Sequence, residues 1–128
     1  MREIDLQPEG DSLVGAITVL ADDLGPGGAS HSYVAHIKTD RCKPESAGEQ
    51  VAAVEYQRGP RSEPGSTPGI VDRVLLAIAE DRLKCFQAGP FACGENDEAL
   101  NYVRAAIAAL KRRASRRSER GVLGKNIA

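Results

Sequence analysis

The sequence predicts an α+β fold, in which an N-terminal antiparallel β-sheet precedes a C-terminal antiparallel helical hairpin. Three observations support this prediction. Residues 13–58 hold three short segments of β-branched or alternating side chains, which are typical of strands. Two later segments, 70–87 and 97–120, repeat apolar residues at intervals of three and four, as amphipathic helices do. The dipeptide Gly89-Pro90 separates these two segments and predicts the turn of a hairpin.

The chain has the length of one domain. At 128 residues it can bury roughly two-thirds of the surface that its unfolded form exposes. We therefore expect a single domain over residues 1–128, with the sheet in residues 1–69 and the helical hairpin in residues 70–128. Because only 4% of the residues are aromatic and none is Trp, the core must consist of Ala, Val, Leu and Ile. Such a core is thin, which makes self-association a plausible source of further burial.

The expected sheet has three strands. They are residues 13–21, 30–38 and 50–58. The first is short and β-branched, and the other two alternate between apolar and polar side chains, as strands with one buried face do. A Gly-Pro-Gly-Gly loop at residues 25–28 predicts an antiparallel hairpin of the first two. Residues 1–9 and 61–67 leave room for further short strands. The Pro- and Gly-rich segment 59–69 is either a flexible linker or a packed, irregular loop.

Each expected helix has recognisable ends. For the first, Gly89 suits a left-handed cap, and Pro90 cannot continue a helix. For the second, Asn96 is the expected N-cap, since its side chain can accept a hydrogen bond from a free backbone N–H. That helix should stop at Gly121, and residues 121–128 should form an extended tail.

Apolar positions predict a packed face on each helix. The stripe of the first helix is Val71, Val74, Leu75, Ile78 and Leu83, and the seam of the second is Leu100, Val103, Ile107, Leu110 and Ala114.

Charge is distributed unevenly. Residues 104–125 carry eight Lys and Arg against one acid, Glu119, although the whole chain has a net charge of −1. This basic segment predicts an anionic ligand near the C-terminal third. Arg113 and Arg117, one helical turn apart, suit phosphate because arginine is always charged and donates bidentate hydrogen bonds. The alternative is a solvated helix end whose positive charges complement the helix dipole.

The sequence offers little for catalysis or metal binding. Cys42, Cys85 and Cys93 form no CxxC pair and have no metal-ligand spacing with His31 or His36, so neither a metal nor a cofactor is expected. Without a Ser-His-Asp motif, an HExxH motif or a carboxylate pair in an apolar setting, we expect no enzyme. No signal peptide and no apolar run of roughly 18 residues is present, so we expect a cytoplasmic protein without membrane contact.

The bend between the helices, residues 85–96, carries two aromatic rings, two thiols and an amide. Phe86 and Phe91 are either core residues or a surface for a flat base. A stacked base contributes roughly 1–3 kcal/mol in single-stranded nucleic-acid sites. Asn96 is either an N-cap alone or also a reader of an adenine edge, which an amide can hydrogen-bond.

Several strings in the chain resemble a family of phage proteins. They are Tyr-Gln-Arg-Gly-Pro at 56–60, Leu-Leu-Ala-Ile at 75–78, Asp-Arg-Leu at 81–83, Phe-Gln-Ala-Gly-Pro-Phe-Ala-Cys-Gly-Glu-Asn at 86–96, Arg-Gly-Val at 120–122, and much of segment 19–31. The chain is similar in these strings to the first Thoeris anti-defence family, which sequesters cyclic ADP-ribose signals. The helical hairpin of that family is related to that of the anti-CBASS cyclic-nucleotide sponge.

The resemblance implies a viral anti-defence sponge in the host cell cytoplasm. Such a sponge binds glycocyclic ADP-ribose of Thoeris, and in some members cyclic di- or trinucleotides of CBASS, without cleaving them. By resemblance, Phe86 stacks on the adenine, Asn96 contacts the same ligand and Arg61 binds its phosphates. Arg113 and Arg117 match the cyclic-oligonucleotide site. The resemblance also implies a homodimer or a trimer of dimers.

Two other functions remain open. The first is a nucleic-acid-binding module that uses the basic C-terminal helix, although nucleic acid is not the expected partner; its affinity should fall steeply with salt. The second is a helical-hairpin adaptor for protein partners, which no small ligand should stabilise against heat. A sponge should instead be stabilised by its cyclic signal.

Overall fold

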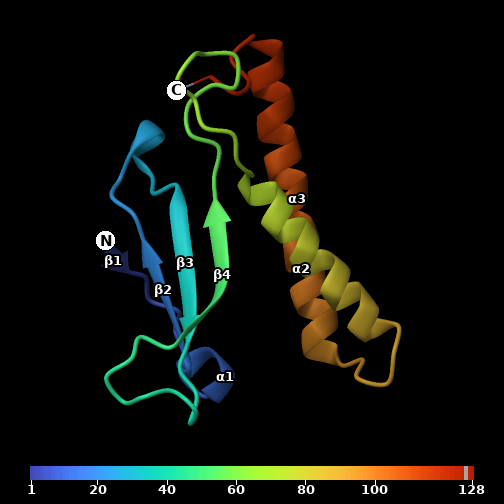
Figure 1. The fold of residues 1–128 in the computed structure, drawn as a ribbon. Helices are drawn as coiled ribbons and strands as arrows, with labels where there is room; N and C mark the ends of the chain where they lie inside the picture. Colours follow the sequence, from blue (N-terminus) through green and yellow to red (C-terminus); the bar gives the residue numbers. More distant parts are fainter. Residues whose placement is uncertain (126) are drawn as a thin grey trace. The chain divides into compact units, whose positions relative to one another are not determined.

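The N-terminal part of the chain is a four-stranded antiparallel sheet in the order β1-β2-β3-β4 (Figure 1). The computed structural model describes residues 1–125 and 127–128, so residue 126 of the predicted tail lies outside the described residues. The strands are β1 (Arg2–Glu3), β2 (Ile17–Ala21), β3 (Ser32–Ile37) and β4 (Glu49–Glu55). Each neighbouring pair is antiparallel, which confirms the α+β prediction and adds β1 to the three expected strands.

The centre of the sheet is the β2–β3 hairpin. Ala21 lies opposite Tyr33 in this ladder and is fully buried. The Tyr33 ring meets the Tyr56 ring edge to face, with 5.8 Å between centroids, a favoured arrangement for aromatic pairs. Between Ala35 and His36 the register with β4 shifts, which marks a β-bulge. Ala21 is thus a fully buried hydrophobic residue of the sheet, and the two half-buried tyrosine rings pack against each other.

The segment predicted as the first strand begins as a short helix. Helix α1 (Ser12–Gly15) precedes β2, and pairing starts only at Ile17. Oδ1 of Asp11 accepts from the backbone N–H of Leu13 at 2.9 Å and of Val14 at 3.2 Å. A carboxylate that satisfies two free donors favours a helical turn over the β propensity of valine. The strand prediction is therefore wrong for this first turn.

Strand β4 ends earlier than predicted, because the chain after Glu55 forms a packed loop. Two isolated bridges close the loop, one between Tyr56 and Ile70 and one between Arg58 and Thr67. At Gly69 a Cβ would overlap the carbonyl group of Tyr56, so only glycine fits there. The connection between β2 and β3 includes the short 3₁₀ helix η1 (Pro26–Gly28). For the Pro- and Gly-rich segment the bridges favour the prediction of an irregular loop over that of a flexible linker, with Pro60 buried and residues 61–65 exposed.

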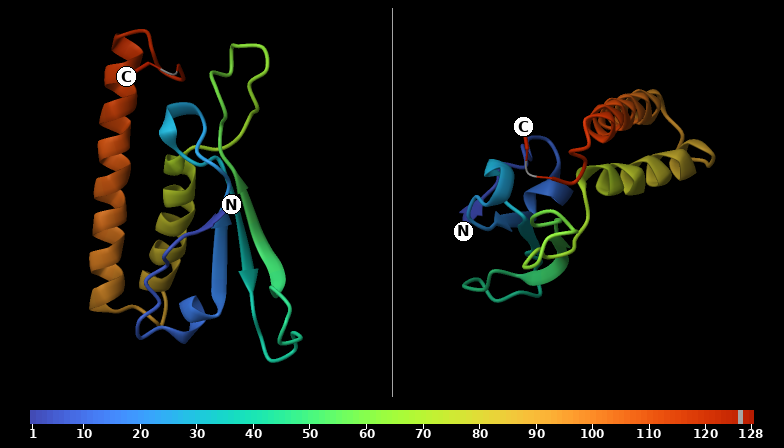
Figure 2. Two further views of the ribbon diagram at one scale, coloured as in Figure 1. Left: turned by 90° about the vertical axis from the view of Figure 1, so that its left-hand side faces the viewer. Right: turned by 90° about the horizontal axis from the view of Figure 1, so that it is seen from above.

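Two helices form the C-terminal part, α2 (Asp72–Gln87) and α3 (Gly94–Glu119), and they lie side by side (Figures 1 and 2). The chain divides into two compact units, residues 1–70 and 71–128, and both helices belong to the second. Leu100 is buried, and the other four members of the predicted α3 seam are half-buried, so the seam is confirmed.

The apolar stripe predicted on α2 is only partly covered. Leu75 and Leu83 are half-buried, whereas Val71, Val74 and Ile78 are exposed, with Ile78 at 56%. The stripe spans more of the helix circumference than one neighbouring helix covers. Helix α3 therefore leaves uncovered an apolar face of α2, defined by Val71, Val74 and Ile78.

The C-terminal ends of α2 and α3 use glycine differently. Gly121 is left-handed, with φ of 70°, and the N–H of Val122 donates to the carbonyl of Arg117 at 2.9 Å. A second bond from Gly121 N–H to the Ser118 carbonyl completes a Schellman motif, which confirms the predicted stop. Gly89, by contrast, is not left-handed, because Ala88 closes α2 in a right-handed conformation. The left-handed cap predicted there is wrong.

Candidate functional site

The side chain of Gln87 ties together the two ends of the bend between α2 and α3. Its Nε2 donates to the carbonyl oxygen of Cys93 at 3.1 Å, and its Oε1 accepts from the Cys93 N–H at 3.0 Å. Cys93 is the N-cap of α3 and has the extended backbone that this position requires, with φ of −153° and ψ of 164°. The prediction of Asn96 as the N-cap is therefore wrong, because the Gln87 carboxamide orders the backbone at Cys93 and α3 begins at Gly94.

Asn96 occupies the first turn of α3, three residues after the N-cap, and is half-buried. Among residues 1–125 and 127–128, its side chain makes no hydrogen bond with the rest of the chain. The Asn96 side chain therefore does not cap the helix. Among the described residues, neither its donor group nor its acceptor group has a hydrogen-bond partner.

Phe86 lies immediately before Gln87 at the end of α2, and 41% of its surface is exposed. The guanidinium carbon of Arg82 lies 5.5 Å from the ring centroid, within the range of a cation–π contact. Phe91, in the bend itself, is 75% exposed. Neither ring is a core residue in this chain, so of the two sequence-based interpretations the core one is wrong for both. Each ring is open to a stacking partner.

Arg61 lies in the packed loop of the N-terminal unit. Its Nε donates to Oε1 of Gln57 at 3.0 Å, and that oxygen also accepts from the N–H of Gly69 at 3.3 Å. Nε2 of Gln57 donates to the carbonyl of Gly59 at 2.8 Å, so one carboxamide organises the whole loop. The hydrogen bonds of Arg61 thus stay within residues 1–70, whereas Phe86 and Asn96 flank the bend of residues 71–128.

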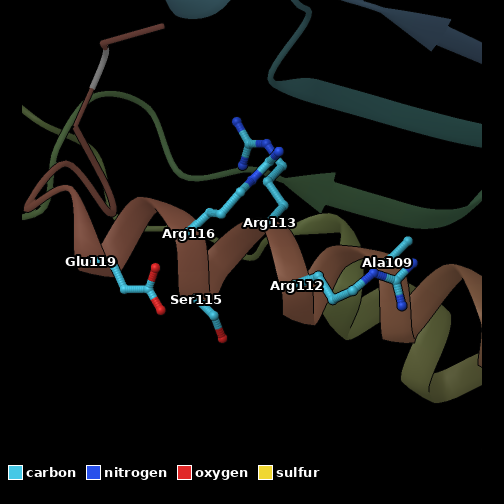
Figure 3. A pocket seen from close by; sticks show the side chains of 6 residues that line it. All are labelled: Ala109, Arg112, Arg113, Ser115, Arg116 and Glu119. Atoms are coloured by element: carbon cyan, nitrogen blue, oxygen red, sulfur yellow. The ribbon is translucent and has the colours of Figure 1, made fainter.

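Three arginines of α3 line an open depression of about 520 Å³ (Figure 3). They are Arg112, Arg113 and Arg116, and Ala109, Ser115 and Glu119 complete the lining. Figure 3 shows the side chains of Arg113 and Arg116 extending to the same side of the helix. Because arginine forks match phosphate oxygens, this arginine depression is suited to an anion.

Arg117 does not line the arginine depression. Its Nη2 donates to the carbonyls of Val122 at 3.1 Å and Lys125 at 2.7 Å, and the residue is half-buried. The structure therefore places Arg113 in the depression and Arg117 against the C-terminal tail. The resemblance did not single out Arg116, although its spacing of three residues from Arg113 predicts the shared face.

A polar cluster in the N-terminal unit escaped sequence-based reasoning. Oδ1 of Asp22 accepts from the N–H groups of His31 at 2.8 Å and Ser32 at 3.1 Å, and Oδ2 accepts from Arg58 at 2.6 Å. The His31 N–H contributes most to lowering the pKa of Asp22, followed by the Ser32 N–H and, to a smaller extent, Arg58; partial burial opposes them. An acid three residues before a glycine-rich loop was the available signal.

The glycine-rich loop packs closely on this cluster. A Cβ at Gly25 would lie 3.2 Å from Nη1 of Arg58 and 3.4 Å from Nδ1 of His31. Ser30 is buried, and its hydroxyl donates to the Asp22 carbonyl at 2.7 Å. The cluster thus fixes the loop to the sheet.

In the part of the chain that the structure describes, no group of three or more His, Cys, Asp and Glu side chains can hold a metal ion. No helix within the same residues is long and apolar enough to cross a bilayer.

Comparison with known proteins gives one similarity that bears on function. The chain is 36% identical over 75 residues to the protein Thoeris anti-defense 1 of Bacillus phage SBSphiJ7. The aligned region covers 59% of this chain and 52% of that protein, so the chain matches about half the length of the phage protein. No family model matches the chain. The similarity supports a relation to Thoeris anti-defence proteins.

Proposed function

We propose that this protein is a viral anti-defence sponge that binds a cyclic nucleotide immune signal and holds it without cleavage. The first ligand class is glycocyclic ADP-ribose, the signal of Thoeris. One observation carries the proposal: the similarity to a Thoeris anti-defence protein in a chain whose bend exposes the Phe86 ring and leaves the Asn96 amide free. Sequestration requires affinity rather than a nucleophile or a general base.

In the proposed bend site, defined by Phe86 and Asn96, the ring stacks on adenine and the amide hydrogen-bonds an edge of the ligand. Arg61 is the proposed phosphate partner. Its guanidinium is exposed and forms hydrogen bonds with neutral groups of the loop, Gln57 and Gly69. A charged phosphate is a stronger acceptor than either of these oxygens, which favours exchange of partners on binding.

A second ligand class, cyclic di- and trinucleotides of CBASS, is proposed to bind at Arg113 and Arg117. The arginine depression supports Arg113 directly. For Arg117, both tail contacts come from Nη2, and a guanidinium has five N–H donors in all. The remaining donors allow Arg117 to contact a phosphate while it still holds the tail.

We also propose that the sponge acts as a single domain within a homodimer or a trimer of dimers in the host cytoplasm. The open apolar face of α2 supports self-association. Val71 and Val74 border a depression of about 500 Å³ whose other lining residues include Ile107 of α3. Burying these groups against a second chain would remove apolar surface from water.

Binding and recovery of the ligand test the proposed function. Purified protein is mixed with an excess of glycocyclic ADP-ribose, free ligand is removed, and the protein is denatured by heat. Mass spectrometry should recover the intact cyclic ligand in a fixed ratio to protein chains. A linear product would show catalysis, and an absence of bound ligand across a panel of cyclic ADP-ribose isomers and cyclic oligonucleotides would refute the sponge.

The arginine depression favours one second candidate, a module that binds nucleic-acid backbones. Three adjacent cations against one acid on this face would neutralise phosphates without reading bases. That function predicts an affinity for single or double strands that falls steeply between low and moderate salt, and little effect of Phe86→Ala.

A further inference from the structure

Gln87, which is not itself proposed to contact the ligand, makes the side-chain hydrogen bonds across the bend. Apart from Gln87, the bend is held by single backbone bonds, such as Gly89 N–H to the Phe86 carbonyl at 3.2 Å and Ala92 N–H to the Gly89 carbonyl at 3.3 Å. Both are at the long end of the hydrogen-bond range. In the described residues the Cys93 side chain makes no capping bond, so its thiol does not hold the start of α3.

We infer that Gln87 is the positioning residue of the bend site: its carboxamide fixes the start of α3 and thereby the placement of Asn96 relative to Phe86. This inference rests on the proposed binding of glycocyclic ADP-ribose. Phe86 is adjacent to Gln87 in α2, and Asn96 lies three residues beyond Cys93 in α3. The two hydrogen bonds across the bend therefore link the last turn of one helix to the first turn of the other.

The physical reason lies in how helix ends behave. The first N–H groups of a helix have no intrahelical partners, and a first turn without a cap frays. The Cys93 carbonyl oxygen accepts from both Gln87 Nε2 and the N–H of Asp97, at 3.1 Å each. The Gln87 side chain and the first hydrogen bond of α3 therefore share one acceptor atom. Without Gln87 that turn loosens, and Asn96 moves with it. Displacements of about 1 Å reduce oriented contacts strongly.

The test compares ligand affinity in Gln87→Met, which keeps the length of the side chain but removes both hydrogen bonds, with the full-length wild type. Calorimetric titration with glycocyclic ADP-ribose should show affinity reduced by about tenfold or more, the loss expected from one misplaced hydrogen bond. Gln87→Glu keeps the acceptor and loses the donor, and should also bind weakly. Gln50→Met, on the exposed face of β4, is the matched control and should bind like the wild type.

A double-mutant cycle separates positioning from a general loss of stability. If Gln87 acts through Asn96, Gln87→Met should change the affinity much less in an Asn96→Ala background, because the contact that it positions is already gone. Leu110→Val, which loosens the seam between the helices much farther along α3, should leave the affinity unchanged when the protein is fully folded. Additive effects of Gln87→Met and Asn96→Ala, or wild-type affinity of Gln87→Met, would overturn the inference. Failure of the wild type to bind any cyclic ADP-ribose isomer would instead refute the proposed function itself.

Discussion

Arg58 and Asp22 form an ion pair in the N-terminal unit, with 2.6 Å between Nη2 and Oδ2. The pair joins the residue after β2 to the loop after β4, 36 positions along the chain. Because Oδ1 of the same carboxylate accepts from the backbone of His31 and Ser32, one ionised side chain organises three segments. The glycine-rich loop and the packed loop are therefore coupled through a single charge.

Replacing Asp22 with Asn should change how stability depends on pH. The pKa of Asp22 lies below its ordinary value of 3.8 in the folded protein. Its contribution to stability is therefore complete above that value and is lost as the pH falls through the lower folded pKa. Asp22→Asn should lower the free energy of unfolding at neutral pH and should flatten its decline below about pH 4. Urea unfolding across the acid range measures both effects.

Asp40→Asn is the control for this series, because its carboxylate lies in an exposed turn after β3. It should leave the acid dependence of unfolding as in the wild type. A wild-type acid slope in Asp22→Asn would contradict the role of Asp22.

Gly69→Ala should destabilise the protein by about 1–3 kcal/mol, the usual cost of forcing an atom into a packed site. The added methyl group would overlap the carbonyl of Tyr56, which is backbone and has little freedom to shift. Gly94→Ala is the matched control, since nothing lies within 4 Å of its added Cβ and alanine favours a helix. Chemical denaturation of both variants checks the prediction, and equal stability of the two would contradict the close approach.

Sequence patterns predicted the elements of this fold better than their ends. Alternation located β3 and β4, and helical periodicity located α2 and α3, because both patterns follow from which side chains must be buried. The errors came from individual side-chain hydrogen bonds. Asp11 turns the start of a predicted strand into a helix, and Gln87 moves the start of α3 from Asn96 to Gly94. No periodicity reports which backbone group a polar side chain will reach.

For the candidate sites too, local sequence patterns did not predict what depends on tertiary packing. An exposed Phe86 is one of two open interpretations, because an aromatic residue on the apolar side of a helix is also typical of a core. Its exposure follows from how much of α2 its neighbour covers, which depends on tertiary packing. The polar cluster around Asp22 joins residues 36 positions apart, so local patterns did not predict it.

Charging the apolar face of α2 should disrupt self-association. Ile78→Glu places a carboxylate on a surface that we propose to be buried between chains, and burying an unpaired charge is costly. The variant should elute as a monomer in size-exclusion chromatography with light scattering, whereas the wild type should have a larger mass. Leu24→Glu, at an exposed leucine of the N-terminal unit, is the control and should keep the wild-type mass. A monomeric wild type would contradict the proposed assembly.

Phe86→Leu should separate the two proposed ligand classes. Leucine keeps an apolar side chain at this position but removes the flat ring, so binding of glycocyclic ADP-ribose should weaken by about 1–3 kcal/mol, the value of a base stacked on an aromatic side chain. Binding of cyclic trinucleotides, proposed at α3, should be unchanged. Thermal-shift titrations with both ligands measure the difference. Phe91→Leu serves as a control for general loss of aromatic surface, and equal losses in both variants would argue against a specific role of Phe86.

Arg113→Gln and Arg117→Gln should differ because only one of these arginines holds the chain terminus. Arg113 lines the arginine depression, so its loss should weaken binding of cyclic trinucleotides and leave stability within about 0.5 kcal/mol of the wild type. Arg117 also donates to the carbonyls of Val122 and Lys125, so its replacement should in addition increase hydrogen exchange in the last turn of α3. Titration and hydrogen-exchange mass spectrometry on the same samples resolve the two effects. If Arg117→Gln altered exchange but bound the trinucleotide like the wild type, Arg117 would be a structural residue, and the ligand site would consist of Arg113 and its neighbours in the depression.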